Sequence, residues 1–138
     1  MARDLFHQVV REALEAEGWS INHDPLVLKL GGLRMEIDLA AEQMLAAEKG
    51  PDRIAVEVKS FVGKSNLNDF YEAKGQYDVY RRGLLREGGQ RRLYLAIDSD
   101  VFQSFFQKSL IAEIVEEDLI SLLVYDVTTK RITQWITR

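Results

Sequence analysis

Three charged residues, Asp38, Glu57 and Lys59, have the types and spacing of a phosphodiester-cleaving site. Glu57 and Lys59 alternate within the apolar stretch IAVEVKSF, residues 54–61, so on a strand both side chains point to one face. Asp38 comes 19 positions before Glu57. If the strands that carry them pair, the two carboxylates converge, and oxygen ligands of this kind suit Mg²⁺ or Mn²⁺. The lysine would then reach the metal-bound water or a phosphate oxygen.

The E-x-K pattern has little specificity by itself, because an ion pair on the wet face of a strand has the same sequence. The pattern recurs as Glu72-Ala73-Lys74 in a stretch that we expect to be helical. On a helix, positions i and i+2 point about 200° apart. We therefore expect the charged residues of this second copy not to share a site.

The elements that must position these residues follow one another closely, with no repeat and no linker. Apolar periodicity and turn residues predict a mixed β-sheet with helices packed on it, an α/β fold in one domain over residues 1–138. A polar, alanine-rich connection is expected between the strand that carries Asp38 and the strand that carries Glu57. We predict helices at 4–17, 66–87 and, in two pieces, 100–117, and strands at 25–30, 33–40, 53–60, 92–98, 119–127 and 131–137.

Composition excludes several classes of function. The chain has no cysteine and two histidines, so thiolate chemistry and a histidine-rich metal cluster are excluded. The longest uncharged apolar run, residues 119–125, is too short to cross a bilayer, so we expect no membrane insertion. The absence of cysteine fits a reducing compartment, and we expect a cytoplasmic protein. The net charge of −4 argues against coating nucleic acid by bulk electrostatics.

A local arginine patch is the remaining candidate for DNA contact. Arg81, Arg82 and Arg86 lie near the end of the predicted helix 66–87, and two further arginines follow within the next six positions. The alternative is a solvated helix end, where arginine also suits the helix dipole. His7, on the first helix, is either a hydrogen-bonded boundary residue or an auxiliary contact to phosphate or water.

The order EID…EVKS after a leading helix resembles the PD-(D/E)XK nucleases and their restriction-endonuclease-like fold. In such proteins both carboxylates hold Mg²⁺ and the lysine assists hydrolysis, and Ile37-Asp38 stands here where the family name has Pro-Asp. The resemblance implies Asp38, Glu57 and the Val58 carbonyl as metal ligands. Gln76 and Tyr80, one helical turn apart, resemble the Q-x-x-x-Y element of RecB-like nucleases.

A closer resemblance covers nearly the whole chain and is carried by several segments in order: RDLFHQVVREALEAEGW, HDPL, LAAEQMLAAEKG, IAVEVKSF, GQYDVYR, LYLAI and SLLVYDV. Together they are similar to the XisH family, controlling factors for excision of the fdxN DNA element in cyanobacteria. That resemblance implies DNA rearrangement as context and an XisI-like protein as partner.

Two functions remain open. In one, the protein is a Mg²⁺-dependent DNA endonuclease with Asp38, Glu57, Lys59, Gln76 and Tyr80 in the site, working as a homodimer or hetero-oligomer because a duplex has two strands to cut. In the other, the same fold binds DNA or an XisI-like partner as a recombination accessory factor without cutting.

Overall fold

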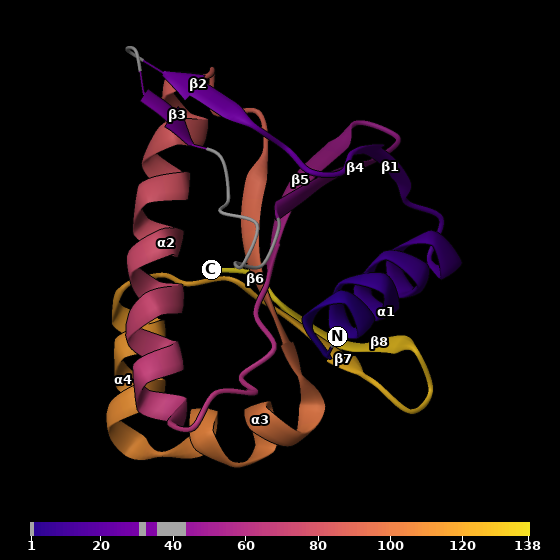
Figure 1. The fold of residues 1–138 in the computed structure, drawn as a ribbon. Helices are drawn as coiled ribbons and strands as arrows, with labels where there is room; N and C mark the ends of the chain where they lie inside the picture. The colour runs from indigo at the N-terminus through magenta and orange to yellow at the C-terminus, as the bar shows by residue number, and fades with distance from the viewer. Residues whose placement is uncertain (1, 31–32, 36–43) are drawn as a thin grey trace.

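A computed structural model of the chain describes residues 2–30, 33–35 and 44–138. Its centre is a six-stranded sheet in the order β1-β4-β5-β6-β7-β8, and a separate antiparallel pair, β2 and β3, lies beside it (Figure 1). The strands of the sheet are β1 (Ser20–His23), β4 (Met44–Lys49), β5 (Asp52–Val58), β6 (Arg92–Asp98), β7 (Leu122–Asp126) and β8 (Arg131–Ile136). The pair consists of β2 (Leu28–Leu30) and β3 (Leu33–Met35).

The sheet is mixed, as predicted, because its central strands run parallel and its outer strands run antiparallel. β5 pairs in parallel with β6, and β6 pairs in parallel with β7. β4 and β8 run antiparallel to their neighbours β5 and β7. The carboxyl ends of β5, β6 and β7 therefore meet at one edge, which is the usual place for a ligand site in sheets of this kind.

Helices cover both faces of the sheet (Figure 1). α1 (Ala2–Ala16) lies on one face, and α2 (Asn66–Arg86), α3 (Ser99–Gln103) and α4 (Ser109–Glu117) lie on the other, with a 3₁₀ turn at Phe105–Gln107. The apolar periodicity that predicted a helix at 66–87 comes from residues that are buried in α2: Phe70, Ala73, Tyr77, Tyr80 and Leu84. No helix within the described ranges is long and apolar enough to span a membrane.

Local sequence explains the ends of α2. The Ser65 hydroxyl accepts a hydrogen bond from the Asn68 amide at 3.2 Å, which caps the first turn. Gly88 and Gly89 follow the helix with φ angles of 116° and 67°. These angles favour glycine and end the helix, so the chain can turn into β6.

Two predictions about the strands are wrong. β1 was not expected, and β4 lies within the stretch expected to be a polar connection. β4 occupies the place beside β5 that was considered for the strand at 33–40, so that Met44 stands opposite Glu57. Pairing with β1 and β5 stabilises β4 although its alanines and glutamate have low intrinsic strand propensity.

Candidate active site

The end of β5 places Glu57 and Lys59 under α2. Residues of the two faces of β5 alternate as predicted: Ile54, Val56 and Val58 pack toward α1, and Ala55 packs with the residues under α2. Glu57 is 1% exposed and Lys59 is 4% exposed. The face that carries these charges is therefore not wet, which removes the simple surface ion pair as an explanation of the pattern.

Helix α2 brings a further charged residue to this strand. The Glu72 carboxylate lies 3.1 Å from the Lys59 ammonium, and the Glu72 side chain is 53% exposed. Lys74 instead pairs with Asp78 and Asp118, so the charges of the Glu72–Lys74 copy do point apart. Its glutamate nevertheless belongs to the β5 site, which sequence reasoning missed.

Tyr80 of α2 lies close enough to β5 for the charge of Glu57 to affect its pKa. Burial, and secondarily the Glu57 carboxylate, raise the pKa of Tyr80 to about 12. The phenol therefore stays protonated throughout the physiological pH range and can act as a hydrogen-bond donor. Gln76, one turn earlier, is half-buried. Glu72, Gln76 and Tyr80 are spaced four residues apart, so they lie along one side of α2.

Tyr77 has a structural role next to this line. Its hydroxyl donates a hydrogen bond to the Leu93 carbonyl and accepts one from the Ser121 amide, each at 3.0 Å. Burial raises the pKa of Tyr77. Tyr77 thereby ties α2 to β6 and to the residue that precedes β7, which fixes the helix above the sheet.

The chain leaves the site through a strained residue, Phe61, which sequence reasoning did not single out. Its φ of 53° is unusual for a bulky side chain. The ring is 7% exposed and packs at 5.5 Å, edge to face, on Phe106 and at 6.2 Å on Phe105. This aromatic packing holds the turn that directs the chain from β5 toward α2.

Other predicted site residues are placed as follows. Asp38 lies outside the described residues. Val58 is fully buried at the end of β5, so only its carbonyl could serve a ligand. His7 is on α1, on the opposite face of the sheet from Glu57, and its Nε2 lies 2.7 Å from the Asp24 carboxylate. The structure therefore does not bring His7 to Glu57 and Lys59.

The three predicted DNA-binding arginines differ in their surroundings. Arg81 donates hydrogen bonds to the carbonyls of Asp118 and Leu119 at 2.9 and 3.1 Å, and its guanidinium lies 5.0 Å from the centre of the Tyr77 ring. These contacts cover the end of α4 and make Arg81 a structural residue. Arg82 and Arg86 are exposed.

The donors at the end of β5 fit a hard cation in kind. A carboxylate and a backbone carbonyl, from Glu57 and Val58, are the oxygen ligands that Mg²⁺ and Mn²⁺ take. Within the part of the chain that the structure describes, no group of three or more histidine, aspartate or glutamate side chains could hold a metal ion. Asp38, the further metal ligand that the resemblance implies, lies outside those ranges.

Comparison with known proteins gives the family. The XisH protein family model matches residues 1–133. The chain belongs to the XisH family. A search of the curated proteins found no match.

Two solved structures resemble this XisH chain over almost all of both molecules. An fdxN element excision controlling factor protein from Anabaena variabilis is 40% identical, with a TM-score of 0.90 over 97% of this chain and 99% of that one. An XisH family protein from Nostoc punctiforme PCC 73102 is 41% identical, with a TM-score of 0.90 over 97% of this chain and 100% of that one. The XisH resemblance seen in the sequence is thus confirmed.

Proposed function

We propose that this XisH protein is a cytoplasmic factor that controls excision of a DNA element and hydrolyses DNA phosphodiesters at the carboxyl end of β5. The observation that carries the proposal is the junction of β5 with α2, where Lys59 pairs with Glu72 at 3.1 Å and Tyr80 lies within the field of the buried Glu57. In this proposal the two motifs E-x-K and Q-x-x-x-Y, which are separate in sequence, contribute to one site.

Each residue has a defined part in this proposal. Glu57, the Val58 carbonyl and Asp38 would hold Mg²⁺ or Mn²⁺, which when bound supplies Lewis-acid activation of phosphate and water. The Lys59 ammonium stabilises negative charge that develops on the phosphate. Tyr80, which keeps its proton because its pKa is raised to about 12, donates a hydrogen bond rather than accepting a proton.

The proposed role on DNA is based on the description of a related protein. The Anabaena variabilis relative is described as an fdxN element excision controlling factor. We propose that this chain likewise acts on DNA, with the exposed Arg82 and Arg86 as contacts to backbone phosphates. An XisI-like protein is the proposed partner, and a homodimer or hetero-oligomer would place two sites on a duplex.

The burial of the charged pair favours a second candidate. Glu57 and Lys59 are 1% and 4% exposed, so a phosphodiester reaches them only if the covering residues move. A recombination accessory factor that binds DNA or its partner without cutting would not need that movement. The same residues would then stabilise the junction of β5 with α2.

Calorimetric titration with Mn²⁺ distinguishes these two functions. Wild type should bind the ion, Glu57→Gln should abolish binding, and Lys59→Ala should keep or tighten it because a neighbouring positive charge is removed. Lys74→Ala is the matched control, since Lys74 is the lysine of the second E-x-K copy and pairs with Asp78 and Asp118. Absence of uptake by wild type at millimolar Mn²⁺, even with DNA and an XisI-like partner present, would overturn the nuclease proposal in favour of the accessory factor.

A further inference from the structure

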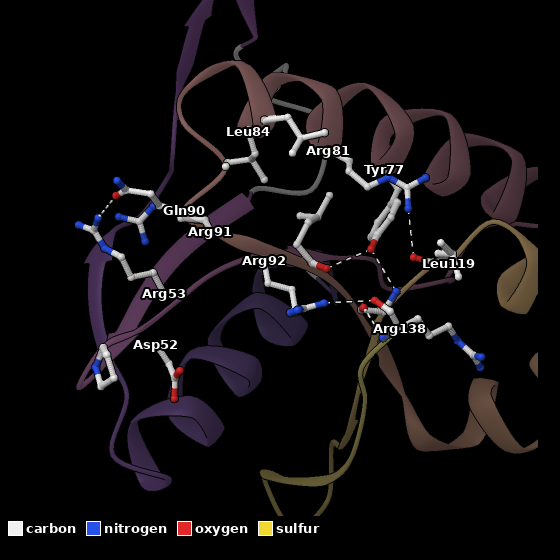
Figure 2. A pocket seen from close by; sticks show the side chains of 15 residues that line it. Asp52, Arg53, Tyr77, Arg81, Leu84, Gln90, Arg91, Arg92, Leu119 and Arg138 are labelled. Atoms are coloured by element: carbon white, nitrogen blue, oxygen red, sulfur yellow. Dashed lines mark hydrogen bonds between the residues drawn. The ribbon is translucent and has the colours of Figure 1, made fainter.

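A pocket of about 490 Å³ lies at the amino ends of β5 and β6, at the opposite end of the sheet from Glu57 and Lys59. Asp52 and Arg53 begin β5 on one side of this pocket, Arg92 begins β6, and α2 contributes Arg81 and Leu84 (Figure 2). Its volume is within the range of small-molecule sites. Arg53 and Glu57 are four residues apart on one strand, or roughly 13 Å, so this pocket is separate from the candidate active site.

The lining of the pocket is strongly basic. Among the side chains that line it, five are arginines and one, that of Asp52, is a carboxylate. The chain as a whole has a net charge of −4, so this concentration of positive charge opposes the overall balance and creates a local field that attracts anions. The arginines are Arg53, Arg81, Arg91, Arg92 and Arg138.

Ion pairs orient the guanidinium groups but neutralise only part of their charge. Arg53 and Arg91 share one carboxylate, that of Glu48, at 2.7 and 3.6 Å. Arg91 also donates a hydrogen bond to the Ile54 carbonyl at 3.4 Å, and Arg92 donates one to a backbone oxygen of Arg138 at 3.1 Å. A guanidinium has five N–H donors, so these contacts leave donors that can reach a ligand.

The surroundings of Arg91 disfavour its positive charge. Burial lowers the pKa of Arg91, and the charge of Arg53 lowers it further. The Glu48 carboxylate that Arg53 and Arg91 share opposes these effects in part, and an anion bound in the pocket would oppose them further at the two guanidinium groups. Their planar forks match the oxygens of phosphate, which binds more than one of them at once.

The rest of the pocket suits the organic part of a ligand. Leu84, Leu93 and the Tyr77 ring contribute apolar surface, and Gln90 contributes an amide. Together with the volume and the arginines, this lining is complementary to a molecule with both a charged and an apolar part. We infer that the pocket binds a phosphate-bearing ligand of nucleotide size. This site does not depend on the nuclease proposal.

Direct titration tests the phosphate site. Inorganic pyrophosphate, a deoxynucleoside triphosphate and a 12-base-pair duplex are each titrated into wild type, into Arg53→Gln/Arg92→Gln and into Lys108→Gln/Arg131→Gln. The last variant is the matched control, because it removes the same charge from exposed positions that neither line the pocket nor belong to the proposed DNA contacts. Arg92→Gln alone is included in case the first double variant does not fold, and melting curves check every protein.

Wild type should bind pyrophosphate and the nucleotide saturably at one site. Arg53→Gln/Arg92→Gln should weaken both by about tenfold or more, and the control should change them less than about twofold. Loss of duplex binding in the same pocket variant would identify a nucleic-acid phosphate as the ligand, and unchanged duplex binding would identify a free nucleotide. No saturable binding of either small phosphate to wild type, or equal losses in the two double variants, would overturn the inference.

Discussion

Lys59, directly after β5, and Glu72 on α2 form an ion pair of 3.1 Å between a side chain that is 4% exposed and one that is 53% exposed. The pair joins the end of the strand to the first half of the helix that covers it. One partner is screened by solvent and the other is not, so the contact can position Lys59 without contributing greatly to stability. Glu72 is therefore best described as a positioning residue for Lys59.

Glu72→Gln should lower the free energy of unfolding by no more than about 1 kcal/mol, because the carboxylate is half-exposed. The same change should alter any activity that depends on Lys59. Urea denaturation measures the first effect, and Glu113→Gln on the exposed face of α4 is the control. Normal activity in Glu72→Gln would show that the pair does not position Lys59.

The raised pKa of Tyr80 predicts a loss of stability in alkali. The reference pKa is 10.0 and the folded value is about 12, so the unfolded chain loses the phenol proton first. Stability from this group is fully present below pH 10 and is lost as pH rises toward 12. Unfolding measured at pH 9 and 11 should show a smaller loss in Tyr80→Phe than in wild type.

Tyr71→Phe provides the control for that pH dependence, because Tyr71 lies on α2 and is 62% exposed. Tyr71→Phe should follow wild type. The pKa of Tyr77 is also raised, so part of the stability loss at high pH should remain in Tyr80→Phe and in Tyr71→Phe. Equal losses in wild type and Tyr80→Phe would contradict the buried environment assigned to Tyr80.

Substitutions of the α2 arginines should differ in their effect on the stability of the protein. Arg81 donates to two carbonyls at the end of α4, so Arg81→Gln should lower the free energy of unfolding by about 1–3 kcal/mol. Arg82 is exposed, and Arg82→Gln should change the free energy of unfolding by no more than about 0.5 kcal/mol. Thermal denaturation measures both, and equal stabilities would show that the Arg81 contacts do not hold α4 in solution.

Phe61 should be unusual in tolerating glycine better than alanine. Either change removes the ring from its packing on Phe105 and Phe106, at a cost of about 3–5 kcal/mol. Glycine also relieves the positive φ of 53°, which alanine does not. The free energy of unfolding measured by chemical denaturation should thus be higher for Phe61→Gly than for Phe61→Ala. The reverse order would mean that the backbone is not strained at Phe61.

The sequence was sufficient for the elements with strong periodicity. The stripe from Phe70 to Leu84 predicted α2, and the alternation along IAVEVKSF predicted which side chains of β5 share a face. It was insufficient for β4, because the stretch around Ala46 and Ala47 lacks the β-branched and aromatic residues typical of strands. Pairing with two neighbouring strands overrides that weak local preference.

The site was predicted only in part, because local spacing is visible in the sequence and tertiary packing is not. Glu57 and Lys59 are two positions apart at the end of β5, so their convergence follows from local extended geometry. Glu72 reaches Lys59 only through the packing of α2 on the sheet. Its spacing of four residues from Gln76, and of eight from Tyr80, was a usable signal, because it puts all three on one line of the helix.

Cleavage of supercoiled plasmid is the most direct test of the proposed active site. Purified protein is incubated with the plasmid in Mg²⁺ or Mn²⁺, with and without an XisI-like partner, and nicked and linear DNA are quantified over time. Wild type and Lys74→Ala should cut, whereas Glu57→Gln and Lys59→Ala should be slower by about a hundredfold or more. Intact plasmid with wild type under every condition, or equal cutting by Lys59→Ala, would contradict a nuclease site at the end of β5.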